Sequence, residues 1–344
     1  MCIMHVYLRT KRKTIMKAAI VWEAGKLPVY GAFADPVPSP GENRITVAAA
    51  ALSPVVKSRA AATHYSSSSQ FPFVVGIDGV GRLDDGTWVY FILPRAPYGS
   101  MAELSVAPSA HCLPLPDGLD AVTAAAIANP GMSSWAAYKQ RARLKAGETV
   151  LINGATGTAG RLAIQIAKHL GAKKVIATGR NANALHSVTA LGADLTISLS
   201  EDGSDLDDSF KTQFVEGIDV VIDYLWGRSA ECLLVAASKV SGVAAKPIRF
   251  IQVGAASGPN LTLPSAVLRS SAIELMGSGL GSISQDRLIV CIAELLKATM
   301  PGGFKIAAKP VPLSEVEQAW TGDDSTRRTV FTVGVPGIDC SVEL

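Results

Sequence analysis

A strand, a glycine-rich turn and a helix follow one another at residues 149–171, and this run constrains the fold more than any other. Residues 149–152 read Thr-Val-Leu-Ile, an apolar run of strand length, and glycines follow at positions 154, 157 and 160. Apolar side chains then recur at helical spacing from position 162 to position 170. A strand without polar alternation is buried on both faces, as in parallel sheets covered by helices. We therefore predict a parallel α/β unit around this turn.

The same alternation continues along the chain. Five further strand-like runs lie at residues 175–178, 195–198, 220–223, 250–253 and 273–276, with helical patterns between them. Six parallel strands with intervening helices make a complete doubly wound (Rossmann) sheet. Residues 16–115 differ, because prolines and glycines separate short β-type runs there, as in a β-rich domain. The predicted fold is thus α/β with a second, β-rich domain, which suits a length of 344 residues.

Charge and composition exclude some partners. The formal net charge is +3, but the first 15 residues hold four basic side chains and no acid, which leaves −1 on the remaining chain. A nearly neutral body gives no electrostatic reason to expect nucleic acid. No apolar run reaches the roughly 18 residues that span a bilayer, so no membrane partner is expected. Five widely spaced cysteines without a Cys-x-x-Cys pair favour a reducing cytoplasm.

The basic segment at residues 1–15 is a separate feature. Its apolar residues precede its charges, which is the reverse of a secretory signal. We expect a disordered extension, or a consequence of start-site choice, with the folded body beginning near Met16.

The glycine turn has the spacing of a dinucleotide site. One glycine makes the tight turn, one lets the backbone approach a pyrophosphate, and one lets the helix pack closely on the strand. The helix start then offers amides and a positive dipole end to phosphates. The predicted phosphate-binding residues are Gly154, Ala155, Thr156, Gly157, Thr158, Ala159 and Gly160. The alternative is an ordinary glycine-rich connection between a strand and a helix.

The end of the second strand indicates which dinucleotide binds. An acid about 20 residues after the turn binds the ribose 2′-hydroxyl in NAD sites. Here the strand ends in Gly179, Arg180 and Asn181, and no acid lies between Glu148 and Asp194. A guanidinium can hold a 2′-phosphate bidentately, so we predict NADPH as the cofactor. The alternative is that Arg180 is a solvated surface side chain.

Several motifs resemble those of the medium-chain dehydrogenase/reductase superfamily, and more narrowly its zinc-free quinone oxidoreductase branch. The main match is the run from Glu148 through the glycine turn to Gly160, continued at 165–168 and 170–172. Further matches lie at residues 129–132, 191–194, 253–254 and 313–320. The resemblance extends from about residue 16 to residue 333.

The resemblance implies a domain organisation. Residues 16–128 would form a GroES-like catalytic domain, 129–277 an NADPH-binding Rossmann domain, and 278–344 a C-terminal segment that completes the catalytic domain. The cofactor would lie in a cleft between the two domains. The resemblance also implies a homo-oligomer, commonly a dimer paired through the cofactor domains.

The nicotinamide end of the cofactor is expected at the carboxyl ends of the later strands, where ligands of such sheets bind. The predicted residues are Met132, Leu225, Trp226, Val253, Gly254 and Ala255. Trp226 stacks near the cofactor or substrate in one interpretation and packs at the domain junction in the other.

No metal is predicted. Zinc-bearing relatives use an early Cys and a Gly-His-Glu motif, and the corresponding positions here carry Ser53 and Ile77. Catalytic zinc needs three protein ligands, and the five histidines are scattered along the chain.

The remaining chemistry is hydride transfer to an already polarised acceptor. Without a Lewis acid, a quinone or an α,β-unsaturated carbonyl is the easiest small-molecule acceptor. The resemblance makes Tyr65 and Ser53 the candidate catalytic residues; the alternative for Tyr65 is a loop aromatic that only lines the cleft. The Asp of related sequences is replaced by Val56, which puts an inherited proton relay in doubt.

Two alternatives of other kinds stay open. One is a non-catalytic NADPH-binding protein, since relatives include lens crystallins and RNA-binding proteins. The other is a zinc-independent alcohol dehydrogenase. NADPH turnover with a quinone or an enone separates the binding protein from the reductase.

Overall fold

A computed structural model describes residues 15–62, 70–200, 204–239, 246–322 and 327–334. The chain divides into two compact units. The described residues of Met1–Pro114, Pro310–Asp323 and Thr329–Leu344 make up the first unit, and those of Leu115–Lys309 and Asp324–Arg328 the second. No helix in these segments is long and apolar enough to cross a bilayer.

The second unit contains a six-stranded parallel sheet. Its strands are β9 (Thr149–Asn153), β10 (Lys174–Gly179), β11 (Leu195–Ser198), β12 (Val220–Asp223), β13 (Ile248–Gln252) and β14 (Ile273–Gly277). They lie in the order β11-β10-β9-β12-β13-β14. The chain builds one half of the sheet from β9 to β11 and then crosses over to build the other half from β12 to β14. The two halves meet where β9 lies beside β12, which is the arrangement of a doubly wound fold. The predicted fold class is confirmed.

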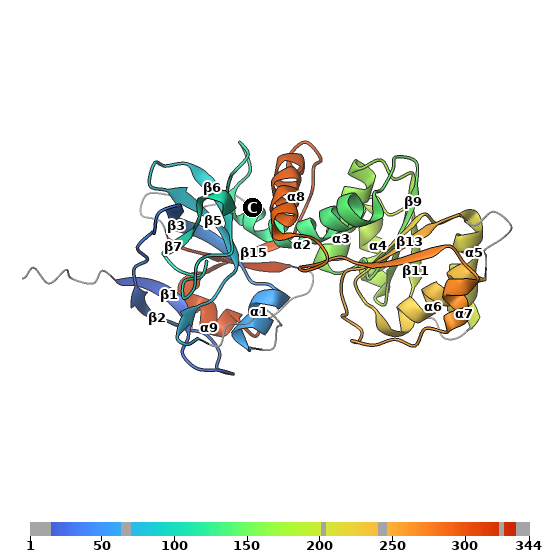
Figure 1. Cartoon of the computed structure of the whole chain (residues 1–344), viewed down its shortest axis with the longest axis horizontal. Helices are drawn as coiled ribbons and strands as arrows, with labels where there is room; N and C mark the ends of the chain where they lie inside the picture. Colours follow the sequence, from blue (N-terminus) through green and yellow to red (C-terminus); the bar gives the residue numbers. More distant parts are fainter. Residues whose placement is uncertain (1–14, 63–69, 201–203, 240–245, 323–326, 335–344) are drawn as a thin grey trace, which may run out of the picture. The chain divides into compact units, whose positions relative to one another are not determined.

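Helices cover this sheet because its strands are apolar on both faces. Leu151 pairs in register with Ile176 and Val221, and Val221 with Phe250, so four apolar side chains form one row. This row belongs to a core shared with α5 (Ser204–Glu216), α6 (Gly227–Ser238) and α7 (Ser265–Arg269). Figure 1 shows α3 (Thr158–His169) and α4 (Ala182–Thr189) on the other side of the sheet from α6 and α7.

Two further helices belong to the second unit. Helix α2 (Ala121–Ala136) continues into a π-helical turn, η2 (Ala137–Ala142), and packs against both α3 and α8 (Gln285–Thr299) (Figure 1). The Trp135 indole N–H donates to Glu294 Oε2 at 2.7 Å across the α2–α8 contact. The boundary between the units therefore lies at Pro114, whereas the sequence analysis placed it at residue 128. Residues 278–309 belong to the second unit, although the sequence analysis assigned them to the first. An amphipathic helix pattern does not say which partner the helix will pack against.

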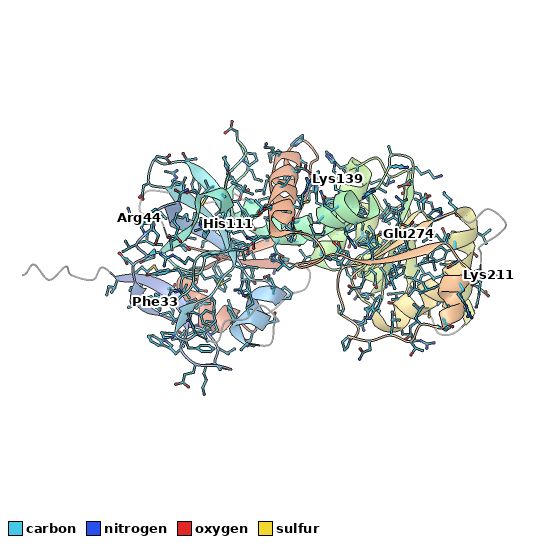
Figure 2. The ribbon with its side chains drawn as sticks, viewed as in Figure 1. Phe33, Arg44, His111, Lys139, Lys211 and Glu274 are labelled. Carbon is cyan, nitrogen blue, oxygen red and sulfur yellow. The ribbon has the colours of Figure 1, made fainter. Side chains whose placement is uncertain are left out.

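The first unit is built from antiparallel strands. One sheet has the order β2-β1-β4, from β1 (Ile15–Val21), β2 (Val29–Ala34) and β4 (Phe73–Val74). Ile15 thus lies inside a strand, not in the extension expected over residues 1–15. The core between β1 and β4 contains Met16, Ile20 and Val74, with Phe33 packed against it (Figure 2).

A larger sheet completes the first unit. Its order is β15-β16-β3-β5-β6-β8, with β7 also paired to β3. The strands are β3 (Glu42–Ala51), β5 (Asp78–Leu83), β6 (Trp88–Ile92), β7 (Leu104–Pro108), β8 (Cys112–Pro114), β15 (Ala308–Pro312) and β16 (Arg328–Thr332). Four short helical segments accompany it: α1 (Pro54–Ala60), η1 (Ser109–His111), η3 (Leu313–Glu315) and α9 (Val316–Ala319). Strand β16, near the end of the chain, thus pairs with β3, and β15 pairs with β16.

Candidate functional site

The glycine turn lies between β9 and α3, and two of its glycines lack a side chain for different structural reasons. Gly154 has φ +88°, and a Cβ there would lie 2.8 Å from Leu225 Cγ. A Cβ on Gly160 would lie 2.6 Å from the Ala155 Cα, so only glycine lets the helix start directly on the turn. Gly157 is the N-cap of α3, and nothing described lies within 4 Å of the Cβ position there. The backbone is therefore accessible at the start of the helix, where a phosphate would bind.

A buried hydrogen-bond network holds this turn in place. The Asn153 side chain donates from Nδ2 to Asp223 Oδ1 at 2.8 Å and to Ser229 Oγ at 2.9 Å. Its Oδ1 accepts from Thr178 Oγ1 at 2.8 Å, and Thr178 Oγ1 accepts from the Gly154 N–H at 3.1 Å. Asn153 thus joins the carboxyl ends of β9, β10 and β12. Sequence reasoning missed this residue, whose signal is a polar side chain at the end of an apolar strand.

Asp223 extends the network to the chain that follows β12. Its side chain is fully buried and accepts from the Leu225 N–H at 2.9 Å and the Trp226 N–H at 3.1 Å. Burial raises the pKa of Asp223, although these amides and the Asn153 amide act in the opposite direction. The bonds hold Trp226 at φ +58°, a region that large side chains seldom adopt.

The end of β10 places Arg180 beside the glycine turn. A Cβ on Gly179 would lie 2.6 Å from Thr156 Cγ2, so this strand end touches the turn. Arg180 is exposed, and its guanidinium has no hydrogen bond or ion pair with any residue that the structure describes. Asn181 differs, because its side chain caps α4 by accepting from the Ala184 N–H at 2.9 Å. Arg180 is thus the side chain available to a ligand.

A second arginine stiffens the turn. Arg161 donates from Nε to the Thr156 carbonyl at 3.0 Å and from Nη2 to Ser187 Oγ at 2.7 Å. It therefore ties the turn to helix α4. Sequence reasoning missed Arg161, because a basic residue at the start of a helix carries no spacing signal.

Tyr224 follows β12 and connects it to helix α2. Its hydroxyl lies 2.7 Å from Ser134 Oγ, and Ser134 comes two residues after the half-buried Met132. Burial is the main reason why the pKa of Tyr224 is raised to about 12. The phenol is therefore neutral at physiological pH and acts as a hydrogen-bonding anchor.

The remaining predicted residues gather at the carboxyl ends of β12, β13 and β14. The Val253 and Gly254 amides donate to the Asp223 carbonyl at 2.8 and 3.1 Å. Trp226 and Ala255 line an open hollow of about 320 Å³ together with residues of β14. Trp226 also packs against the core under α5 and α6 of the second unit. Both interpretations of its role, near the cofactor or at the domain junction, stay predictions.

The catalytic candidate Ser53 belongs to the first unit. Ser53 is 2% exposed and caps α1, accepting from the Val56 N–H at 3.2 Å. The structure therefore gives the Ser53 hydroxyl a helix-capping role. Tyr65 lies outside the described residues, and its catalytic role stays a prediction.

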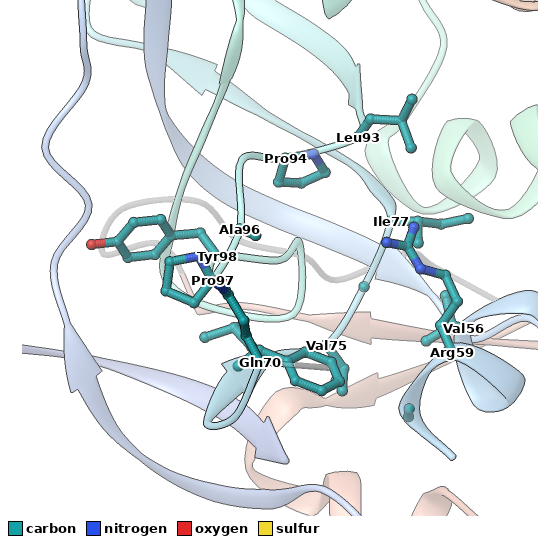
Figure 3. A pocket seen from close by; sticks show the side chains of 14 residues that line it. Val56, Arg59, Gln70, Val75, Ile77, Leu93, Pro94, Ala96, Pro97 and Tyr98 are labelled. Atoms are coloured by element: carbon teal, nitrogen blue, oxygen red, sulfur yellow. The ribbon is translucent and has the colours of Figure 1, made fainter. Parts of the chain in front are cut away.

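Ile77 is the residue that the resemblance assigns to the position of a zinc-ligand histidine. It lines a pocket of about 90 Å³ with Val56, Arg59 and Leu93 (Figure 3). Within the described segments, no group of three or more His, Cys, Asp or Glu side chains could hold a metal ion.

Comparison with known proteins finds relatives along the whole chain. A family model described as zinc-binding dehydrogenase matches residues 159–297. A probable NADPH-dependent quinone reductase of Emericella nidulans is 30% identical, in an alignment that covers 92% of this chain and 100% of the relative. A 2-methylene-furan-3-one reductase of Solanum lycopersicum is 28% identical over 78% of this chain and 71% of the relative.

The fold is also that of solved structures. A quinone oxidoreductase from Thermus thermophilus, whose structures include a complex with NADPH, has a TM-score of 0.76 to this chain at 23% identity. The match covers 92% of this chain and 100% of that protein. It shows that both units have a counterpart in one known architecture.

Proposed function

Because the chain belongs to the medium-chain dehydrogenase/reductase superfamily and is a quinone oxidoreductase-like member, we propose that it transfers hydride from NADPH to quinones or α,β-unsaturated carbonyls without a metal. That it is an oxidoreductase follows from its relatives. The cofactor preference, the acceptor class and the absence of a metal are our proposal.

Arg180 is the observation that carries the cofactor assignment. It is exposed at the end of β10, beside the glycine turn, and unpaired among the described residues. An acid at this strand end would repel a 2′-phosphate, whereas a guanidinium binds it through charge-assisted hydrogen bonds. The NADPH dependence printed for the Emericella relative and the NADPH complex of the Thermus protein also support this choice.

The residues present fit a dinucleotide. The uncapped start of α3 and the open backbone at Gly157 would accept the pyrophosphate, and Arg180 the 2′-phosphate. Residues around Trp226 and Ala255, which line the hollow beside β14, would hold the nicotinamide end. A bound nicotinamide supplies the hydride, and the protein positions the acceptor and excludes water.

An electron-poor acceptor suits the first unit. Ile77 cannot ligate zinc, and the pocket that it lines is mostly apolar. Quinones and conjugated carbonyls accept hydride with only modest stabilisation of the developing oxyanion, whereas alcohol oxidation requires removal of a hydroxyl proton. The Emericella relative is named as a quinone reductase, and the Solanum relative as a reductase of 2-methylene-furan-3-one, a conjugated ketone. These names support the two proposed acceptor classes.

An acceptor panel tests the reaction. NADPH oxidation is measured with 1,4-benzoquinone, with a conjugated enone and with a simple saturated ketone. We expect turnover with the first two and little with the third. NADPH binding without turnover on any acceptor would instead favour a non-catalytic binding protein, and turnover mainly of the saturated ketone would favour an alcohol dehydrogenase.

We also propose a homodimer in the cytoplasm. Strand β14 ends the parallel sheet and leaves one edge without a neighbour among the described strands. Leu275 on this strand is 37% exposed, and Leu268 and Leu280 nearby in sequence are 46% and 45% exposed. An open edge with apolar side chains is a template for strand pairing. Light scattering after chromatography measures the mass, and Leu275→Lys should shift it towards the monomer.

A further inference from the structure

The first unit contains a small pocket with one charged side chain in its wall. Val56 and Arg59 of α1 form one side, residues 73–77 another, and the loop after β6 the rest (Figure 3). The walls are mainly apolar and include Phe73, Val75, Ile77, Leu93, Pro94 and Pro97. Among the described residues that line the pocket, Arg59 alone is charged.

The Arg59 guanidinium has no acidic partner among the residues that the structure describes. It is half-buried, and no hydrogen bond or ion pair joins it to any residue in the described segments. Figure 3 shows it extended alongside Ile77. Burial lowers the pKa of this guanidinium, but arginine stays protonated at physiological pH. A desolvated charge beside apolar walls is costly unless a partner pairs with it.

The pocket volume limits the size of that partner. About 90 Å³ is available. An engineered cavity of about 150 Å³ is known to hold a benzene ring. The pocket is therefore suited to a substituent with a few heavy atoms, not to a whole aromatic acceptor. A carboxylate has this size, and its two oxygens match the two-pronged geometry of a guanidinium.

We propose that this pocket selects acceptors that carry a carboxylate, with Arg59 as the residue that binds it. The inference rests on the proposed reductase function and names its substrate class: quinones or conjugated carbonyls with an ionised side group. The apolar walls strengthen the pairing, because a charge-assisted hydrogen bond is worth more where water is excluded. Arg59 then acts as a specificity-determining residue and takes no part in hydride transfer.

A matched pair of enones tests the proposal. Benzylideneacetone is neutral, and 4-carboxybenzylideneacetone differs from it by one carboxylate at the far end of the ring. Binding of each is measured by calorimetry without NADPH, and kcat and KM are measured with NADPH. In Arg59→Met we expect the Kd and KM of the carboxylate compound to rise about 100-fold or more, since two charge-assisted hydrogen bonds are lost. The constants of the neutral compound and both kcat values should change little.

Two variants serve as controls. Arg44→Met removes the same charge from the same unit, but Arg44 pairs with Asp84 at 3.0 Å on the surface, so neither ligand should be affected (Figure 2). Arg59→Lys keeps the charge without the planar fork and should give an intermediate loss for the carboxylate compound only. Thermal unfolding of each variant checks that the fold is intact.

The outcomes separate the two proposals. Equal weakening of both compounds in Arg59→Met, or no preference of the unmodified protein for the carboxylate compound, would overturn the selection by Arg59. Arg59-dependent binding of the carboxylate compound, without NADPH oxidation by this compound or by any acceptor of the panel above, would support the pocket and refute the reductase function.

Discussion

Replacing Arg180 with alanine should weaken NADPH binding and leave NADH binding nearly unchanged. Hydrogen bonds to a charged group are worth about 1.5–3 kcal/mol. Arg180 is exposed, so solvent and salt screen the interaction and the lower half of this range applies. The expected rise in the NADPH dissociation constant is therefore about 10- to 45-fold.

The same substitution should not destabilise the fold. The guanidinium makes no hydrogen bond or ion pair within the described segments, so its removal leaves no buried group unsatisfied. Nucleotide fluorescence titrations give both dissociation constants, and thermal unfolding gives the stability. Arg228→Ala, another exposed arginine of the same unit, is the matched control. Equal losses for NADPH and NADH would refute the 2′-phosphate assignment.

Three further predictions concern the support of the glycine turn. Asn153→Ala should lower the free energy of unfolding by about 1–3 kcal/mol in denaturant titrations, because buried Asp223 and Thr178 lose a partner; an unchanged midpoint would contradict this. Gly160→Ala should abolish NADPH binding or shift the turn visibly in a structure, since a Cβ would lie 2.6 Å from the Ala155 Cα; unchanged affinity would contradict this, because it would mean that the turn tolerates a Cβ. Tyr224→Phe should cost about 0.5–1.5 kcal/mol below pH 10, and this cost should fall as pH rises towards the raised pKa of about 12, because the neutral phenol is the stabilising form; a cost that grows with pH would contradict the sign.

The parallel sheet and the turn could be predicted because their signals are local. Apolar strands, three spaced glycines and Arg180 each occupy short stretches whose conformations follow from residue type. The glycines also have separate jobs, since Gly154 has a positive φ and Gly160 touches backbone.

The network under the turn could not be predicted, because it depends on which strand ends become neighbours. Asn153 and Asp223 are 70 residues apart and meet only through the β9–β12 pairing. The placement of helix α8 with α2 has the same non-local origin. Ser53 shows a further limit, because its hydroxyl acts as a helix cap in a position where the resemblance suggests catalysis.

The central claim is metal-free hydride transfer from NADPH to an electron-poor acceptor. Its most direct test is the steady-state rate of NADPH oxidation by 1,4-benzoquinone with protein that has been treated with a chelator and checked for metal content. We predict full activity after this treatment and a kcat/KM for NADPH at least tenfold above that for NADH. Loss of activity that zinc restores, or equal use of the two cofactors, would contradict it.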